Sequence, residues 1–321
     1  MAVYTEVSDT ALQAFLADYD LGRLLAYKGI AEGVENSNFF VHAEAGFFIL
    51  TLYEKRVAAE DLPFFLGLME HLAAHGLNCP QPVKPKTGAL LGRLAGKPAA
   101  IVTFLEGVSS RSPTSRQCAA LGESLASLHR AGADFSGHRR NALSLDAWAG
   151  LYEQGKNGSE NVQAGLADFI AAEIGFLEKA WPLDLPRGVI HADLFPDNVL
   201  FLGDTVSGLI DFYFACDDFL AYDLAICLNA WCFELDGSFN ITKGMALINA
   251  YEQMRRLTPE ETAALPILAR GAALRFALTR LVDWLNVPPG ALVKPKDPLD
   301  YVKRLRFHQK ITNAREFGLL R

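Results

Sequence analysis

The sequence has no long uninterrupted hydrophobic run. The longest apolar stretch, residues 220–235, is broken by Asp223, Asn229 and Glu234, so we expect a buried helix there rather than a membrane span. The first six residues, MAVYTE, lack the basic region and apolar core of a signal peptide. These absences predict a cytoplasmic protein with no membrane partner.

Basic residues are not in excess. The chain has 30 lysines and arginines against 37 acidic residues, a net charge of −7, and no basic stripe, which argues against nucleic acid as a partner. Its five cysteines are odd in number and follow no spacing pattern, so we expect reduced thiols rather than a disulfide framework. A chain of 321 residues, half of them hydrophobic, suits a globular enzyme of two lobes.

Four polar residues between positions 189 and 212 carry most of the functional information. His191, Asp193 and Asn198 lie in VIHADLFPDNVLF, and Asp211 follows in GLIDF. Kinases build a phosphoryl-transfer site from a catalytic-loop Asp, an Asn five residues later and an Asp at the end of the next strand. An ordinary surface hairpin would explain an isolated Asp and Asn, but not all four residues in this order.

The spacing also predicts geometry. Residues 198–202 and 206–212 read as two strands joined by a Gly203-Asp204 turn, so Asn198 and Asp211 should reach the same end of a hairpin. Their oxygens suit a hard cation such as Mg²⁺, and we predict both as metal ligands. Asp193 is the predicted catalytic base or orienting group for a hydroxyl nucleophile. We expect the remaining residue of the four, His191, to hold the loop through hydrogen bonds.

The rest of the chain divides near Glu106-Gly107. Before this point we expect a five-stranded sheet with one inserted helix, and after it mostly helices. We predict a nucleotide-binding lobe at 1–105 and a catalytic and substrate-binding lobe at 106–321. The expected strands are 24–29, 37–43, 47–53, 88–93 and 97–104, and the expected helices are 9–19, 61–75, 113–132, 145–152, 162–181, 220–235, 243–256, 259–284 and 299–317.

This combination of lobes and motifs resembles the aminoglycoside phosphotransferase-like kinases over almost the whole chain. The resemblance implies an α+β, two-lobed, protein-kinase-like fold with a small antiparallel-sheet lobe, and the use of ATP and Mg²⁺. Phe212 is followed by Tyr213 rather than glycine, and no Ala-Pro-Glu segment is present, which argues against a eukaryotic-type protein kinase. The chain also lacks a P-loop.

Three further segments, 33–41, 48–55 and 275–284, look like those of the bacterial homoserine kinases of this fold. That resemblance implies transfer of the γ-phosphoryl group of ATP to the side-chain hydroxyl of L-homoserine, giving O-phospho-L-homoserine for threonine biosynthesis. Two alternatives stay open. One is another small-molecule kinase of the same fold, acting on an amino alcohol, a sugar or an aminoglycoside, and the other is a catalytically inactive nucleotide-binding protein.

The nucleotide site is expected at two places in the first lobe. The turn between the first two strands should cover the phosphates, although an ordinary hairpin turn would look similar. Residues 103–106 should form the hinge, whose backbone bonds the adenine edge. The predicted nucleotide-binding residues are Gly33, Asn36, Ser37, Asn38, Phe104 and Leu105.

One feature departs from the family pattern. The third strand usually carries a lysine that pairs the ATP phosphates with a helix glutamate, but Thr51 stands at the lysine position and Phe65 near the glutamate position. Losing both partners together avoids a buried unpaired charge. Lys28, Lys55 and Arg56 are alternative sources of positive charge.

The resemblance also implies an amino-acid substrate. Its carboxylate calls for an arginine, and Arg275 and Arg280 lie on a late helix. Its ammonium calls for a carboxylate or an aromatic face, which Asp283 and Trp284 offer three and four residues after Arg280. The alternative is a solvated Arg-Asp pair beside a core tryptophan.

His71 and His75 stand four residues apart on an expected helix. This spacing can bind zinc, but no glutamate follows the first histidine, which argues against a metalloprotease helix. We expect both to be surface histidines.

Overall fold

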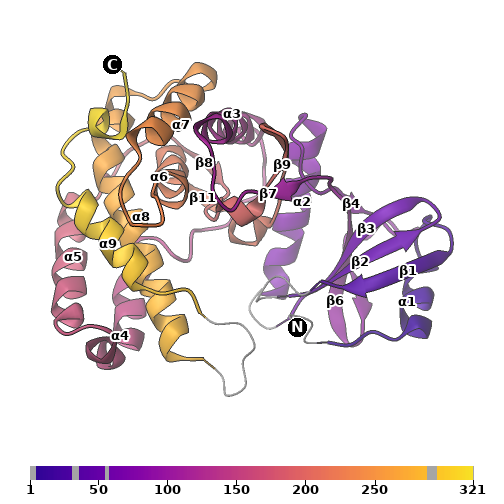
Figure 1. Cartoon of the computed structure of the whole chain (residues 1–321). Coiled ribbons are helices and arrows are strands. Elements are labelled where there is room, and N and C mark those ends of the chain that lie inside the picture. Colours follow the sequence, from indigo (N-terminus) through magenta and orange to yellow (C-terminus); the bar gives the residue numbers. More distant parts are fainter. Residues whose placement is uncertain (1–4, 31–35, 55–57, 288–294, 321) are drawn as a thin grey trace.

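The computed structural model describes residues 5–30, 36–54, 58–287 and 295–320. A sheet-bearing lobe and a larger helical lobe lie side by side, and helix α2 (Leu62–Ala74) stands between them (Figure 1). The predicted α+β architecture with a strand-rich first third is therefore confirmed.

The sheet of the first lobe has six strands in the described part of the chain, one more than predicted, and all of its pairings are antiparallel. Its order is β1-β2-β3-β6-β4, and β5 pairs with β6 beside this path. The missed strand, β4, has only two residues, which is too short to show an alternating pattern. The elements are α1 (Asp9–Leu16), β1 (Leu24–Gly29), β2 (Ser37–Ala43), β3 (Gly46–Leu52), β4 (Pro82–Val83), β5 (Gly92–Leu94) and β6 (Lys97–Thr103).

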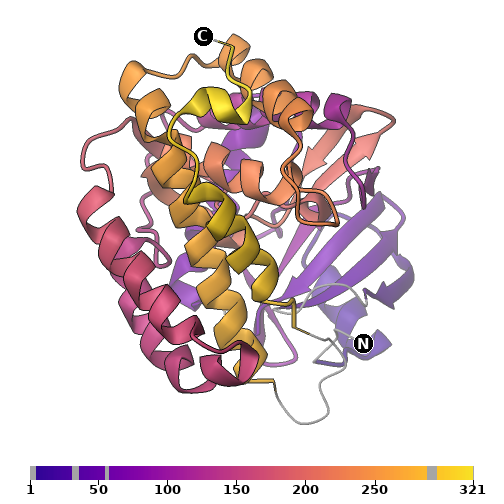
Figure 2. The ribbon, with the colours of Figure 1, turned by 60° about the vertical axis from the view of Figure 1, so that its left-hand side comes forward.

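The second lobe contains seven long helices and two small sheets within the described residues. Helix α8 is the longest, with 27 residues and a capping box formed by Thr258 and Glu261. The helix predicted at 299–317 ends at His308 as α9, which packs along α8 (Figure 2). The elements are β7 (Val108–Ser109), α3 (Ser115–Ala131), α4 (Leu145–Val162), α5 (Leu166–Ala180), β8 (Arg187–Ile190), β9 (Val199–Leu202), β10 (Thr205–Leu209), β11 (Cys216–Phe219), α6 (Leu220–Trp231), α7 (Ile241–Met254), α8 (Pro259–Leu285) and α9 (Leu299–His308).

Two hydrophobic clusters form the core. The smaller one packs α1 against the sheet through residues such as Leu12, Phe39 and Leu50. The larger one fills the helical lobe and also takes in the buried face of α2, including Phe65 and Leu66. Helix α2 therefore belongs to the first lobe by sequence order and to the second by its packing, so it is the element that ties the lobes together.

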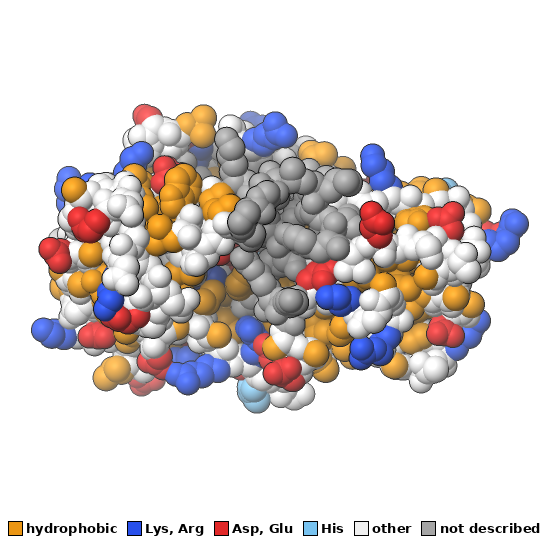
Figure 3. Space-filling model, turned by 90° about the horizontal axis from the view of Figure 1, so that it is seen from below, with side chains coloured by type: hydrophobic (Ala, Val, Ile, Leu, Met, Phe, Trp, Pro, Cys, Tyr) orange, Lys and Arg blue, Asp and Glu red, His pale blue; other side chains and the backbone are white. Residues whose placement is uncertain are grey.

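The surface seen from below carries lysine, arginine and acidic side chains interspersed with hydrophobic ones, and its described residues gather into no basic patch (Figure 3). In the described part of the chain, no helix has the length and apolarity that a bilayer crossing would need.

Candidate active site

The predicted hairpin brings Asn198 and Asp211 to one end. Strands β9 and β10 pair antiparallel with Val199 opposite Leu209, and the Ile210 N–H donates to the Asn198 carbonyl over 3.0 Å. The second strand ends at Leu209, two residues earlier than Asp211. Asp211 adopts a left-handed conformation (φ 65°, ψ 61°) and leads into a 3₁₀ turn, Phe212–Phe214. Its exposed carboxylate thus follows directly on the residue paired with Asn198.

The catalytic-loop carboxylate, Asp193, is fixed by Asn198. The Asn198 amide Nδ2 donates to the Asp193 carbonyl over 2.8 Å and to its Oδ2 over 3.3 Å. Because the amide nitrogen is used in this way, the Asn198 Oδ1 is the atom left to act as a ligand. Burial raises the pKa of the Asp193 carboxyl, and the charge of the Arg275 guanidinium opposes this rise.

The backbone of this loop is held by hydrogen bonds to a fully buried carboxylate, Asp223 on α6. Its Oδ2 accepts the His191 N–H over 2.7 Å, and its Oδ1 accepts the Ala192 N–H over 2.9 Å. Ala192 has φ 62°, a left-handed conformation that a non-glycine residue adopts only when its surroundings enforce it. The sequence showed Asp223 only as a polar interruption of an apolar helix, and its place beneath the loop appears only in three dimensions.

A chain of polar contacts keeps Asp223 ionised. His129 Nε2 lies 3.3 Å from the Asp223 carboxylate, while its Nδ1 lies 2.8 Å from the Tyr251 hydroxyl. Burial pushes the pKa of Asp223 upward, but the hydrogen bond and charge of His129, with the N–H of His191, outweigh this and lower the pKa. A buried carboxylate in this state is a strong, fixed acceptor for the loop backbone.

His191 has a structural position, as the sequence suggested. Its buried ring places Nε2 3.0 Å from the Ile210 carbonyl, which can only accept, so Nε2 carries the proton. Burial is the main cause that lowers the pKa of this histidine, which keeps the ring neutral near pH 7. His191 therefore joins the catalytic loop to the strand that leads to Asp211.

Of the predicted substrate residues, the structure brings Arg275 to the loop. Its guanidinium donates to the Ala192 carbonyl over 3.2 Å and lies 3.7 Å from the Asp193 carboxylate. Arg280 instead contacts the Asp297 carbonyl and the Asp300 carboxylate near the start of α9.

Asp283 and Trp284 lie further along the same helix. They are exposed, and their backbone is displaced by about 12–13.5 Å along α8 from Arg275, at 1.5 Å per residue. The structure therefore does not bring them to Asp193 directly. Their assignment to substrate binding stays a prediction.

A cavity of about 330 Å³ adjoins the loop and is lined by Ala192 and Arg275. Two further polar residues that line this cavity, Asp61 and Arg139, were not predicted from the sequence. The Arg139 Nε donates to Asp61, just before α2, over 2.7 Å, and its Nη1 donates to the Ala215 carbonyl over 3.2 Å. The signal available was the polar run 138–141 between two helices, but nothing local shows that this run reaches the N-terminal end of α2.

The predicted phosphate-binding residues have other contacts in this structure. The Asn36 Oδ1 accepts the Glu54 N–H, and the Ser37 hydroxyl donates to the Glu54 carboxylate over 2.8 Å. Asn38 Oδ1 accepts from the Thr51 hydroxyl over 2.8 Å. Gly33, and the alternative cations Lys55 and Arg56, lie outside the described residues, so the phosphate contacts stay predictions.

The position of the usual strand lysine is built differently here. Thr51 is buried and bonded to Asn38, and the next inward residue, Tyr53, has its hydroxyl 3.1 Å from the Tyr213 hydroxyl. The Tyr213 ring also meets the Phe65 ring edge to face at 5.6 Å. Hydroxyl and aromatic contacts thus connect the end of β3, helix α2 and the segment after Asp211. In the family pattern, a lysine–glutamate ion pair connects the strand and the helix.

The predicted hinge is bonded to the hairpin that holds the predicted metal ligands. The Ser207 hydroxyl donates to the Glu106 carbonyl over 2.7 Å, and a Cβ at Gly208 would lie only 2.6 Å from the Leu105 side chain. Phe104, 39% exposed, meets the Phe40 ring edge to face at 5.4 Å. The hinge is therefore held in a fixed relation to Asn198 and Asp211.

The fold and this loop define a small-molecule phosphotransferase of the kinase-like class. A family model described as the phosphotransferase enzyme family matches residues 26–257. Solved structures with the same fold include an amicoumacin kinase in complex with AMP-PNP and Ca²⁺ (15% identity, TM-score 0.68, 96% of this chain and 95% of that one). A microcompartment-associated aminopropanol kinase is similar to the same degree (16% identity, TM-score 0.68, 97% and 99%).

Curated relatives narrow the family. The homoserine kinase of Methylobacterium nodulans is 67% identical over 318 residues, 99% of each chain. The homoserine kinase of Beijerinckia indica subsp. indica is 66% identical over 321 residues, the whole of each chain. The chain thus belongs to the homoserine kinases of the phosphotransferase enzyme family, and it is an ATP-using, alcohol-acceptor kinase.

Proposed function

We propose that the protein transfers the γ-phosphoryl group of ATP to the side-chain hydroxyl of L-homoserine, forming O-phospho-L-homoserine in the cytoplasm for threonine biosynthesis. The observation that carries the proposal is the loop that holds Asp193 beside Asn198, one hairpin away from Asp211. The relatives named homoserine kinase, which match over their full length, support homoserine as the substrate.

Asp193 is proposed to orient the substrate hydroxyl and accept its proton. Its position is fixed by Asn198 and by the neighbouring Arg275, so the carboxylate needs little reorganisation when substrate binds. Such positioning accounts for much of phosphoryl-transfer catalysis. Arg275 also limits the burial-driven rise in the pKa of Asp193, which favours the ionised form that a base requires.

Asn198 and Asp211 fit a Mg²⁺ ion. One offers an amide oxygen, because its nitrogen is bonded to Asp193, and the other offers an exposed carboxylate at the end of the same hairpin. Oxygen ligands of this kind suit a hard cation that also retains water and phosphate oxygens. When bound, the ion would neutralise charge on the phosphates, and Asn198 and Asp211 would be the residues that hold it.

The cavity beside Ala192 is the proposed acceptor site. Its volume of about 330 Å³ suits a small metabolite, and the cavity is lined by Arg275 and Arg139, either of which can pair with a carboxylate. Asp61, which pairs with Arg139 and also lines the cavity, offers a negative charge to an ammonium group. Of the residues predicted from the sequence, Arg275 has the strongest structural support as a substrate ligand, while Arg280, Asp283 and Trp284 stay predictions.

The test is a coupled ADP-release assay with ATP and Mg²⁺ against homoserine, serine, threonine, choline and an aminoglycoside. We expect turnover with homoserine. In Asp193→Asn, kcat should fall by about 10²–10⁴-fold, the usual contribution of a general base. The matched control is Asp197→Asn, which changes an exposed carboxylate of the same loop that pairs with Lys296 and should keep most activity.

Two results would contradict the proposal. Brisk turnover of another compound in the panel, with no turnover of homoserine, would support a kinase activity but contradict homoserine as the substrate. Full activity in Asp193→Asn would remove the loop from the mechanism.

A further inference from the structure

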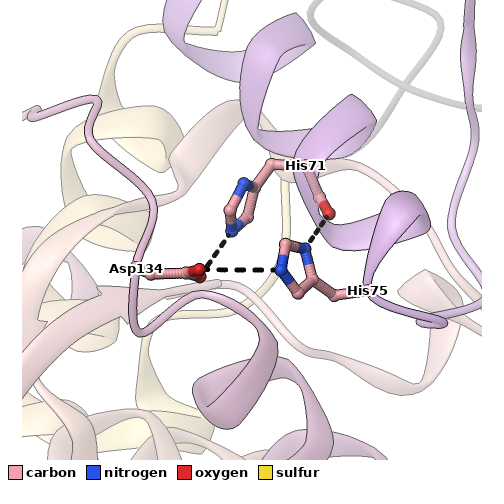
Figure 4. Close-up of side chains that lie close together, drawn as sticks. All are labelled: His71, His75 and Asp134. Carbon is pink, nitrogen blue, oxygen red and sulfur yellow. Dashed lines mark hydrogen bonds and ion pairs between the residues drawn. The ribbon is translucent and has the colours of Figure 1, made fainter.

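A cluster of two histidines and an aspartate lies at the junction of the two lobes. His71 and His75 stand one turn apart near the end of α2, and Asp134 lies in the segment that follows α3. Figure 4 shows both imidazole rings directed toward the Asp134 carboxylate. In the described part of the chain, this is the one group of three histidine, cysteine or acidic residues whose ligand atoms lie within 4.8 Å of one another.

The distances match those between ligands of a tetrahedral ion. His71 Nε2 lies 3.1 Å from Asp134 Oδ1, and His75 Nε2 lies 3.6 Å from Asp134 Oδ2. Two ligands each about 2.0–2.1 Å from a tetrahedral centre are separated by about 3.3–3.4 Å. The three side chains therefore need only small rotations to share one ion, and the partly exposed site leaves room for water as a further ligand.

The ring of His75 is oriented as in a metal site. Its Nδ1 lies 2.8 Å from the His71 carbonyl, which can only accept, so Nδ1 donates to this carbonyl and Nε2 is the nitrogen directed toward Asp134 (Figure 4). A hydrogen bond from the second ring nitrogen to a backbone carbonyl is the usual support of a metal-bound histidine. His71 differs, because its Nε2 also lies 3.0 Å from the Ala131 carbonyl and so carries a proton when no metal is present.

We propose that His71, His75 and Asp134 form a binding site for a transition-metal dication, with Zn²⁺ as the best fit. Two imidazoles and one carboxylate favour zinc over magnesium, which prefers an all-oxygen octahedron. The site is chemically distinct from the oxygen ligands Asn198 and Asp211. Binding requires the proton on Nε2 of His71 to move to Nδ1, so that a neutral imidazole offers its Nε2 lone pair to the ion.

Such a site would join the lobes. Its two histidines belong to α2, which stands between the sheet and the helical lobe (Figure 1), and its aspartate follows α3 of the helical lobe. Metal that binds the folded state alone raises stability in proportion to RT ln(1 + [metal]/Kd). The ion would therefore fix the end of α2 against the helical lobe, independently of ATP.

The experiment is an equilibrium titration of the reduced, nucleotide-free full-length protein with Zn²⁺ after removal of metal by a chelator. We expect saturable one-to-one binding and a rise in Tm on zinc addition. In His75→Ala, the affinity should fall by at least about tenfold, the loss that even an outer-shell change produces. Asp134→Asn should behave similarly, and it provides a second test if the first variant folds poorly.

His138→Ala is the matched control, because His138 is also exposed and also pairs with an aspartate, Asp217. It should bind zinc as the wild-type protein does. Equal affinity in the wild-type protein and in both site variants would place the metal elsewhere and overturn the proposal. Absence of one-to-one binding in the wild-type protein would overturn it as well.

Discussion

Replacing Asp223 by asparagine tests whether this buried carboxylate holds the catalytic loop. The carboxylate accepts two backbone N–H groups, from His191 and Ala192, and pairs with the ring of His129. Asparagine has nearly the same shape but only one acceptor oxygen. Its NH₂ group would face one of these N–H donors, which would leave a buried donor unsatisfied, and the negative charge would be lost.

The expected loss of stability is about 3–5 kcal/mol, the typical cost of breaking a buried charged network from one side. Each hydrogen bond to a charged group contributes about 1.5–3 kcal/mol, which gives the same range when one bond and part of another are lost. Ala192 would also be released from its left-handed conformation. Because Asp193 follows Ala192 directly, a shift of about 1 Å would lower kcat by about 100-fold.

Urea unfolding and steady-state kinetics at low temperature, where the variant remains folded, measure both effects. The matched control is Glu173→Gln, which breaks the buried bidentate pair with Arg270 between α5 and α8. It should cost comparable stability while kcat is retained. If Asp223→Asn unfolds at the wild-type urea concentration, or keeps full kcat, the argument that Asp223 positions the loop is wrong.

The pH dependence of stability gives a second readout of the same residue. The pKa of Asp223 is lowered in the folded state, so its contribution is present above the unfolded pKa of about 3.9 and is lost as the pH falls through the folded value. The wild-type protein should lose this stability in acid. In Asp223→Asn, the corresponding part of the acid limb should be absent.

Three other substitutions make separate predictions. Burial lowers the pKa of His308 to about 3, so below about pH 6.5 the unfolded state binds a proton that the folded state does not bind. The free energy of unfolding should therefore drop by about 1.4 kcal/mol per pH unit between about pH 6 and 4. Urea unfolding of His308→Gln should show a flatter pH profile. Thr51→Lys should destabilise the protein by about 3 kcal/mol or more in thermal or urea unfolding, because it places an ammonium at a buried position. Arg275→Gln removes the charge that opposes the raised pKa of Asp193, so the acid limb of kcat/KM should move to higher pH, and an unmoved limb would contradict the proposed pairing.

The sequence predicted the parts of the site that depend on local structure. A turn dipeptide and two apolar strands suffice to place Asn198 beside the residue that precedes Asp211, because hairpin register follows from the turn. The helix holding Arg275 was also predictable from its spacing. The predicted hairpin was wrong at its end, since the second strand stops at Leu209.

Long-range contacts were not predictable in this way. Asp61 and Arg139 are 78 residues apart, and no local pattern shows that they meet at the wall of one cavity. The role of Asp223 depends on its distance from a loop 31 residues earlier in the chain. Such contacts follow from tertiary packing, which a single sequence does not specify through periodicity.

The replacement of the strand lysine has a consequence for how α2 is positioned. Where a lysine and a glutamate join strand and helix, the coupling is electrostatic and its strength depends on the surrounding charge. Here the Tyr53 hydroxyl meets that of Tyr213, and Phe65 of α2 meets the Tyr213 ring. Burial raises the pKa of Tyr213 to about 12, so neither partner changes charge near neutral pH. Since these contacts carry no positive charge, packing positions α2, and the charge that faces the ATP phosphates has to come from residues other than Thr51.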